Sequence, residues 1–191
     1  MNNSSILNDK QIAYLATTGK MIIPFEEKLN TSGIISYGLS SYGYDIRLSN
    51  HDFRIIGGNH KDEIDPKRFD DNCVFNIELT SNYYWLPAHS YALGVSVESF
   101  NIPANTIAIA LGKSTYARCG ILINVTPLEP EWTGHLTIEI ANLTNFPCKI
   151  YANEGIAQLL FFQGEQCNTT YADRNGKYQN QPRSVVLPKV I

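Results

Sequence analysis

Hydrophobic and polar residues alternate along most of this chain, in short segments rich in β-branched and aromatic side chains. Glycine, proline or asparagine bounds each segment, which is typical of β-strands. No helical pattern of roughly 10–15 residues separates the segments, so an all-β barrel or sandwich is favoured over a parallel sheet with crossover helices. Strands are expected at 42–49, 51–56, 73–79, 91–98, 106–111, 121–125, 136–142 and 156–162.

One segment near the N-terminus, 8–18, has the spacing of a helix instead. Asn8 or Asp9 can cap its first turn, and Gly19 can end it. We expect this helix to pack on a sheet, which is a structural role. Its apolar stripe consists of Ile12, Leu15 and Ala16.

Three segments lack a strand or helix pattern. The Gly/Ser-rich segment 31–41 is expected to be a loop, and the charged segment 57–72, with Pro66, a surface loop. The last segment, 164–191, is polar and has too few apolar residues to form core. It is expected to be either a loose tail or a segment that becomes ordered when a ligand binds.

Length and charge narrow the class of protein. A chain of 191 residues with 43% hydrophobic residues is expected to form a single domain, 1–191. The net charge of −3 argues against binding to a nucleic-acid backbone, although a few local cations suffice for one nucleotide. The chain has no apolar run of about 18 residues and no signal-peptide pattern. A cytoplasmic protein without membrane contact is therefore expected, with its four cysteines as free thiols.

Two nucleotide-related motifs can be rejected. The sequence LGKST at 111–115 resembles part of a phosphate-binding P-loop, but Ile107 stands where that motif requires glycine. Its backbone N–H groups and Lys113 could still hold an anion, although a plain turn is the simpler interpretation. No histidine or cysteine has the spacing of a zinc nucleobase deaminase, so catalytic zinc is not expected.

Glu139, Ser114 and Arg118 are the candidates for chemistry. On strand 136–142 the apolar residues share one face, and Glu139 lies on the other. It is either a solvated carboxylate or a proton-transfer group in a pocket, and spacing alone does not decide. If 114–118 is a helical turn, Ser114 and Arg118 point the same way and could polarise a carbonyl, a phosphate or a water. A surface arginine is an equal alternative.

The sequence GKSTYARCGILINVTPLEPEWTGHLTIEIANLT at 112–144 resembles the core of the bacterial dCTP deaminases, which belong to the trimeric dUTPase-like superfamily. SYGYDIRLS at 41–49, NEGIAQLLFF at 153–162 and YADRNGKYQNQ at 171–181 are similar to further motifs of that family, in the same order. The resemblance covers nearly the whole chain. It implies a mainly β fold, a distorted β-barrel or β-clip, with an N-terminal helix and few short helices. It also implies that Asp45 supports the scaffold.

The resemblance implies hydrolysis of dCTP to dUTP and ammonia without zinc, supplying dUTP for dUMP and thymidylate synthesis. Glu139 would be the general acid/base, with Ser114 and Arg118 holding the water and the tetrahedral centre. Magnesium would be carried by the nucleotide phosphates, with no metal site in the protein. The implied substrate-binding residues are Lys113, Ser114, Thr115, Tyr116, Ala117, Arg118, Thr137, Ile138, Glu139, Gln158, Tyr171, Lys177 and Gln181.

The family also implies a homotrimer with sites between subunits, a tail at 164–191 that closes over the nucleotide, and dTTP as a competing inhibitor. The elbow at 127–131, PLEPE, is shorter and more acidic than in some members, so no base contact is assigned to it.

Other functions on this scaffold stay open. A dUTP diphosphatase would need an aspartate where this chain has Asn124, and an amide cannot act as a base. A bifunctional enzyme that releases dUMP is a further alternative. A non-catalytic nucleotide sensor is the alternative outside enzymes, and the presence of Ser114, Arg118 and Glu139 counts against it.

Overall fold

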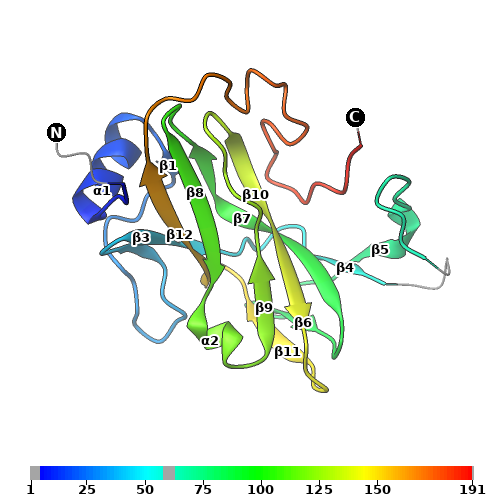
Figure 1. The fold of residues 1–191 in the computed structure, drawn as a ribbon. Coiled ribbons are helices and arrows are strands. Elements are labelled where there is room, and N and C mark those ends of the chain that lie inside the picture. Colours follow the sequence, from blue (N-terminus) through cyan, green and yellow to red (C-terminus); the bar gives the residue numbers. More distant parts are fainter. Residues whose placement is uncertain (1–4, 58–62, 191) are drawn as a thin grey trace.

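The computed structural model describes residues 5–57 and 63–190, and Figure 1 shows its fold. The expected single domain 1–191 and the expected surface loop 57–72 therefore include residues that lie outside the described ones, namely 1–4, 58–62 and 191. Within the described ranges, no helix is long and apolar enough to cross a membrane.

Residues 5–57 and 63–190 form a mainly β structure of three antiparallel sheets. The largest has the order β5-β4-β7-β10-β9, with β1 also pairing with β7. Its strands are β1 (Ile22–Ile23), β4 (Arg54–Ile56), β5 (Val74–Asn76), β7 (Tyr91–Asn101), β9 (Ile121–Asn124) and β10 (Thr133–Asn142). The second sheet has the order β2-β3-β12-β8, and the third pairs β11 with β6. Their strands are β2 (Gly38–Ser40), β3 (Gly43–Arg47), β6 (Tyr83–Leu86), β8 (Thr106–Gly112), β11 (Cys148–Tyr151) and β12 (Gly155–Gln163).

The mainly β fold with open sheets confirms the fold class expected from the sequence, and each expected strand overlaps an observed one. The differences are local. The strand expected at 51–56 begins only at Arg54, because Asp52 has a left-handed backbone (φ 57°). The loop expected at 31–41 contains β2, and β1, β6 and β11 were not expected. All four are short strands, which makes their alternation hard to see in sequence.

Helix α1 (Asp9–Thr18) confirms the expected N-terminal helix. Asn8 caps it through a reciprocal capping box with Gln11, and the Gly19 N–H donates to the Leu15 carbonyl at its end. The two other helices of the described residues are short: α2 (Ser114–Ala117) and the 3-10 helix η1 (Asp71–Cys73). The expected apolar stripe faces inward, with Ile12 and Ala16 buried.

A buried ion pair joins the two larger sheets. Glu98 on β7 is fully buried and accepts hydrogen bonds from the Arg47 Nε and the Arg47 backbone N–H of β3, at 2.7 and 2.9 Å. The guanidinium also lies over the Tyr37 ring, 4.6 Å from its centroid. Because both charges are held by several partners, this contact fixes one sheet against the other.

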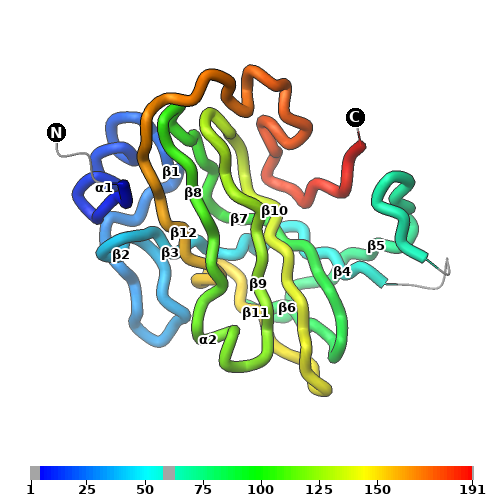
Figure 2. Tube along the Cα trace, viewed as in Figure 1, coloured from blue at the N-terminus to red at the C-terminus, as the bar shows by residue number. Residues whose placement is uncertain are grey.

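The tail after Gly164 lies against β10 of the largest sheet. Figure 2 shows it crossing the ends of β8 and β10 and turning back beside β10. There Gln181 forms a parallel bridge with Gly134, which has φ 128° and so little room that an added Cβ would lie 2.4 Å from the Gln181 nitrogen. Val185 is buried, so the expectation that the tail contributes nothing to the core is wrong for this residue. Alternation did not reveal it because the tail packs as irregular turns.

Candidate active site

Strand β10 presents Glu139 on the face opposite the core. Ile138 and Ile140 on either side of it are fully buried, whereas Glu139 is half-buried. The facing residue on β9 is Asn124, and its side-chain amide donates a hydrogen bond to Glu139 Oε2. Burial raises the pKa of the Glu139 carboxyl above its ordinary value, and this hydrogen bond opposes part of that shift. The environment therefore suits a group that both accepts and delivers protons.

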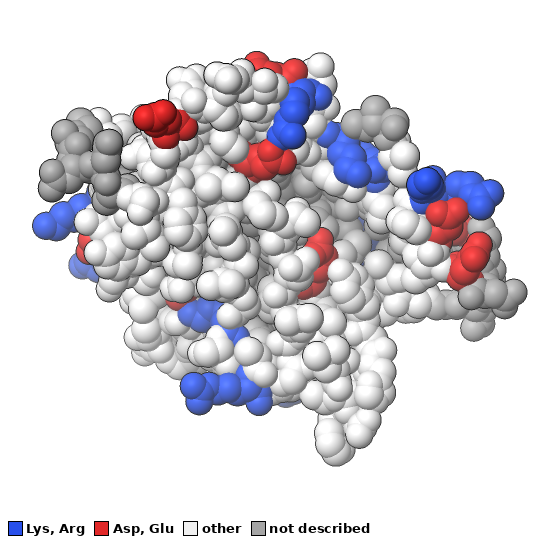
Figure 3. Space-filling model, viewed as in Figure 1, with Lys and Arg blue, Asp and Glu red and all other residues white. Residues whose placement is uncertain are grey.

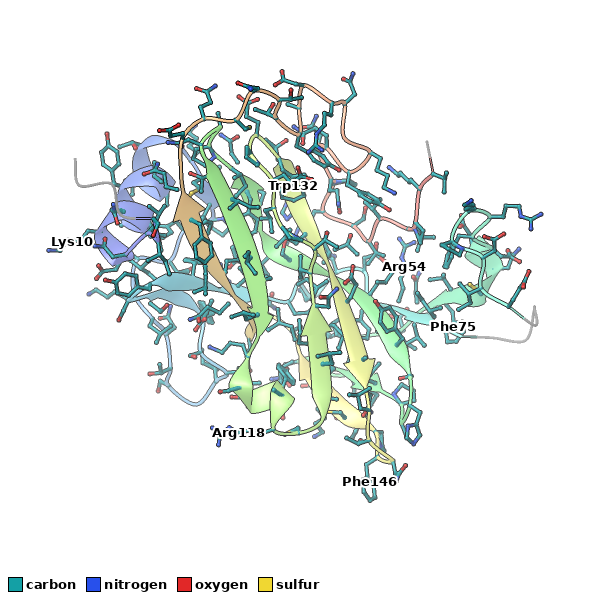
Figure 4. The ribbon with its side chains drawn as sticks, in the orientation of Figure 1. Lys10, Arg54, Phe75, Arg118, Trp132 and Phe146 are labelled. Atoms are coloured by element: carbon teal, nitrogen blue, oxygen red, sulfur yellow. The ribbon has the colours of Figure 1, made fainter. Side chains whose placement is uncertain are left out.

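The turn after β8 carries Ser114 and Arg118. Helix α2 runs over Ser114–Ala117, and the Arg118 N–H donates to the Ser114 carbonyl at 3.0 Å, which confirms the expected helical turn. Both side chains are exposed, and Figure 4 shows Arg118 at the α2 end of the molecule. Thr115 and Ala117 of the same turn are exposed as well. This end is thus accessible to a ligand.

Lys113 precedes this turn and already has partners within the chain. Its Nζ lies 2.5 Å from Asp45 Oδ2 and 2.7 Å from Ser36 Oγ. Asp45 is buried, and its Oδ1 has no hydrogen-bond partner. The ion pair holds the Lys113 ammonium against β3 and is compatible with the scaffold role expected for Asp45.

Tyr116 and Ile138 can offer a ligand only their backbone. Ile138 is fully buried, and Tyr116 is 3% exposed. The Tyr116 hydroxyl accepts a hydrogen bond from the Tyr151 N–H at 2.8 Å, and burial raises the pKa of this phenol. Gln158 on β12 is partly exposed and donates to Ser40 Oγ at 3.2 Å. It lies beside Leu111 of β8, in the sheet that leads into α2.

A cavity of about 500 Å³ lies between the elbow, β10 and the tail. Four of the predicted substrate-binding residues line it: Thr137, Tyr171, Lys177 and Gln181. Glu139 follows Thr137 on the same face of β10, just beyond the cavity lining. The other lining residues come from β8, from the elbow and the residues next to it, from β10 and from the tail. They are Ile107, Val125, Thr126, Pro127, Leu128, Glu129, Pro130, Trp132, Leu136 and Tyr178.

Hydrogen bonds hold the tail over this cavity. The Thr137 hydroxyl donates to Gln181 Oε1 at 2.9 Å and accepts from the Val186 N–H at 3.1 Å. The Trp132 indole donates to the Tyr178 carbonyl at 2.8 Å. Lys177 Nζ lies at the outer side, where it donates to the Lys189 carbonyl at 2.9 Å. The predicted binding residues of the tail thus lie at this cavity and are held by contacts within the chain.

The acidic elbow, to which sequence reasoning assigned no contact, binds the tail. Glu129 forms an ion pair with Arg174, and Glu131 Oε2 accepts a hydrogen bond from the Thr170 hydroxyl at 2.6 Å. The excess of acids at 127–131 was visible in the sequence, but their partners lie far along the chain. Only the fold brings them together.

The predicted site residues therefore fall into two groups in one chain. Ser114, Arg118 and their neighbours lie at the α2 end, and Figure 4 shows Arg118 and Trp132 at opposite ends of the molecule. Trp132 lines the cavity under the tail. Among the described residues, no group of three or more His, Cys, Asp and Glu could hold a metal ion. His60, one of the four histidines, lies outside the described residues.

The chain is similar to known proteins both in sequence and in fold. The family model described as dCTP deaminase-like matches residues 6–164. The dCTP deaminase of Acidobacterium capsulatum is 52% identical over 187 residues, covering 97% of this chain and 100% of that protein. The dCTP deaminase of a Sulfurovum species is 52% identical over 184 residues, covering 96% of each.

Among solved structures, the 2'-deoxycytidine 5'-triphosphate deaminase from Agrobacterium tumefaciens matches with a TM-score of 0.63 at 20% identity. The match covers 85% of this chain and 49% of that one, so the chain spans about half the length of that protein. At this identity the likeness supports the fold alone. Together with the near full-length sequence relatives, it leads to one conclusion. The chain belongs to the dCTP deaminase-like family, as its sequence predicted, and is an enzyme of the hydrolytic deaminase class.

Proposed function

We propose that this protein hydrolyses dCTP to dUTP and ammonia. The relatives named dCTP deaminase match almost the whole chain at 52% identity. The observation that carries the proposal is the half-buried Glu139, whose carboxyl has a raised pKa beside the Asn124 amide. A carboxylate with this environment can take a proton from water and return it to a leaving group.

In the proposed reaction Glu139 removes a proton from water while the oxygen attacks C4 of cytosine. The proton passes to N3, which gives a tetrahedral centre bearing both the new hydroxyl and the amino group. Glu139 then moves the hydroxyl proton to the amine, the C4–N bond breaks, and ammonia leaves. The products balance as dUTP and ammonia, and the step uses no zinc.

Ser114 and Arg118 would hold the water and stabilise the tetrahedral centre. In one chain they lie at the α2 end, so we infer that they act on the nucleotide of a neighbouring subunit. A homotrimer with sites between subunits is the assembly proposed here, and the separation of the two groups of residues supports it.

The triphosphate would be bound by tail and turn together. Lys177, Tyr171 and Gln181 come from the tail, and the backbone and hydroxyls of Ser114 and Thr115 come from the turn. Lys113 would contribute its charge from the ion pair with Asp45. Magnesium would arrive with the nucleotide, bound to its phosphates.

We also propose a cellular role for the reaction and an inhibitor for the enzyme. The reaction would supply dUTP for thymidylate synthesis in the cytoplasm, without contact with nucleic acid. A dTTP molecule would compete for the same pocket as dCTP. A titration of the deamination rate with dTTP tests this point.

The first experiment is a chromatographic assay of dCTP with the purified protein and magnesium, in which dUTP, dUMP and ammonia are followed separately. Ammonia with dUTP is expected. Ammonia with dUMP and pyrophosphate would instead establish the bifunctional enzyme, and Asn124 in place of an aspartate argues against it. Intact dCTP together with cleavage of added dUTP would establish a dUTP diphosphatase and overturn the proposal.

Glu139→Gln tests the assigned chemistry, because glutamine keeps the shape but cannot accept a proton. We expect turnover to fall by at least about 1,000-fold, with dCTP binding retained in calorimetry. Glu165→Gln, at an exposed position at the start of the tail, is the control and should keep full activity. Normal deamination by Glu139→Gln would disprove the mechanism.

A further inference from the structure

A row of facing residues crosses the largest sheet at the level of Glu139. Glu139 on β10 faces Leu93 on β7, and Leu93 faces Arg54 on β4. On the other side, Glu139 faces Asn124 on β9. Directly facing residues of antiparallel strands point to the same side of a sheet, so these side chains share the surface on which Glu139 lies.

Within this row Asn124 is the residue that touches the carboxylate. Its Nδ2 donates to Glu139 Oε2, which leaves Oε1 for a water or a substrate proton. A side-chain amide carries no charge at any working pH, so its donor function does not change when Glu139 gains or loses a proton. A hydrogen bond to one oxygen also fixes the rotation of the carboxyl group about its last bond.

Of the other charged or titratable groups around Glu139, none among the described residues is hydrogen-bonded or ion-paired to its carboxylate. Arg54 forms an ion pair with Asp52, at 2.5 Å between Nε and Oδ1. Tyr91 on β7 stays protonated, because burial and then the charge of Glu139 raise its pKa to about 12. Burial and the charge of Arg183 in the tail lower the pKa of His135. Asn124 is therefore the neighbour that stabilises the ionised form of Glu139.

We propose that Asn124 is a positioning residue for the deamination: its amide holds one oxygen of the Glu139 carboxylate and orients the other toward the attacking water. This inference rests on the proposed function for its kinetic part. It goes beyond the expectation that Asn124 marks the absence of a diphosphatase base. The same amide that cannot act as a base holds the group that does.

Asn124→Leu tests the proposal, because leucine has a similar size and no donor. A hydrogen bond to a charged group is lost, so kcat should fall about 10- to 100-fold while KM changes little. The donor lowers the pKa of Glu139, and its loss raises that pKa. The acid limb of the plot of kcat against pH should therefore move to higher pH. Asn124→Asp adds a like charge and should move the limb further.

The matched control is Asn76→Leu. Asn76 is an exposed asparagine in the same row, facing Arg54 on β5, with β4 and β7 between it and β10. It should leave both kcat and the pH profile unchanged. An unchanged profile in Asn124→Leu would overturn the proposal, and so would a raised KM with unchanged kcat, which would indicate a substrate contact.

Carbon-13 NMR titration of the Glu139 carboxyl in the free protein separates this inference from the proposed function. The apparent pKa should be higher in Asn124→Leu than in the wild type, whether or not dCTP is the substrate. Equal values would overturn the inference even if deamination is observed. Asn124→Ala, which also lacks a donor, serves as the second variant if the leucine variant does not fold.

Discussion

Lys113 forms an ion pair within the chain. The GKST turn offered it as a phosphate ligand, and the structure pairs its ammonium with Asp45. The two side chains are 13% and 4% exposed, so this pair is largely shielded from water. Removing one partner of such a pair leaves the other charge uncompensated.

We therefore expect Lys113→Met and Asp45→Asn each to lower the free energy of unfolding by about 2–4 kcal/mol. The double variant should lose less than the sum, because no charge is left alone. Urea denaturation measures all three. Lys10→Met, at an exposed lysine of α1 that Figure 4 labels, is the control and should change stability by less than about 0.5 kcal/mol. Strict additivity would show that the pair is not coupled.

For single residues, the sequence predicted which face of a strand a side chain lies on, but it did not predict which residues that side chain contacts. The alternation of β10 placed Glu139 opposite the buried Ile138, and the structure agrees. The bond to Asn124 depends on the register between β9 and β10, which no local pattern encodes. The Lys113–Asp45 contact likewise joins residues that are 68 positions apart.

Among the elements, the tail differs most from its sequence pattern. Its polar composition suggested either a loose tail or a segment that becomes ordered when a ligand binds. In the structure it is held by the elbow, by Trp132 and by β10. Those contacts are side-chain and backbone hydrogen bonds across long separations, and hydrophobic periodicity carries no information about them. The longer strands were predictable because buried and exposed residues alternate along them.

A chain that ends at Gly164 tests the role of the tail. It should keep its β-sheet circular dichroism, because the strands of all three sheets precede this point. Calorimetry should show dCTP affinity lower by about tenfold or more, since Tyr171, Lys177 and Gln181 are gone. Trp132 is 5% exposed under the tail, so in a Trp85→Phe background its fluorescence should shift to the red.

Arg174→Gln is the companion variant. Its ion pair with Glu129 is exposed, and such pairs contribute at most about 1 kcal/mol. It should therefore bind dCTP almost as the intact chain does. Unchanged dCTP affinity in the truncated chain would contradict closure of the tail over the nucleotide.

Strands β8 and β9 present an apolar patch on the surface of the molecule. Ile107, Ile109 and Leu111 on β8 and Leu122 on β9 are 36–56% exposed. Figure 3 shows a broad uncharged area over these strands, with charges scattered around it. An exposed apolar patch of this kind is typical of a surface that another protein chain covers. It fits the proposal that copies of this chain complete each other's sites.

Mixing two inactive variants tests that proposal. Arg118→Ala lacks the α2 group and Glu139→Gln lacks the carboxylate. If each site takes one group from each of two neighbours, every mixed trimer contains one intact site. Equal mixing after dissociation and reassociation should therefore restore about a quarter of wild-type activity. Light scattering should give about three times the chain mass of 21.4 kDa. Mixed trimers without activity would place each site within one chain.

The fold class was predictable because alternation and turn residues reflect the burial of the longer strands. The assembly was not, since exposed apolar residues on β8 look in sequence like any half-buried strand. The family resemblance supplied the trimer as an expectation, and the apolar surface supplies a physical reason to test it.

The bridge between Gly134 and Gln181 has a consequence for solubility. Strand β9 covers β10 only along 139–142, and beyond that point the tail takes the same edge, where the His135 N–H donates to the Gln181 carbonyl. An uncovered strand edge is a template for pairing with other chains. The tail therefore covers a strand edge at which other chains could pair and aggregate. Proteolysis within the tail would expose this edge of β10 and would also open the cavity.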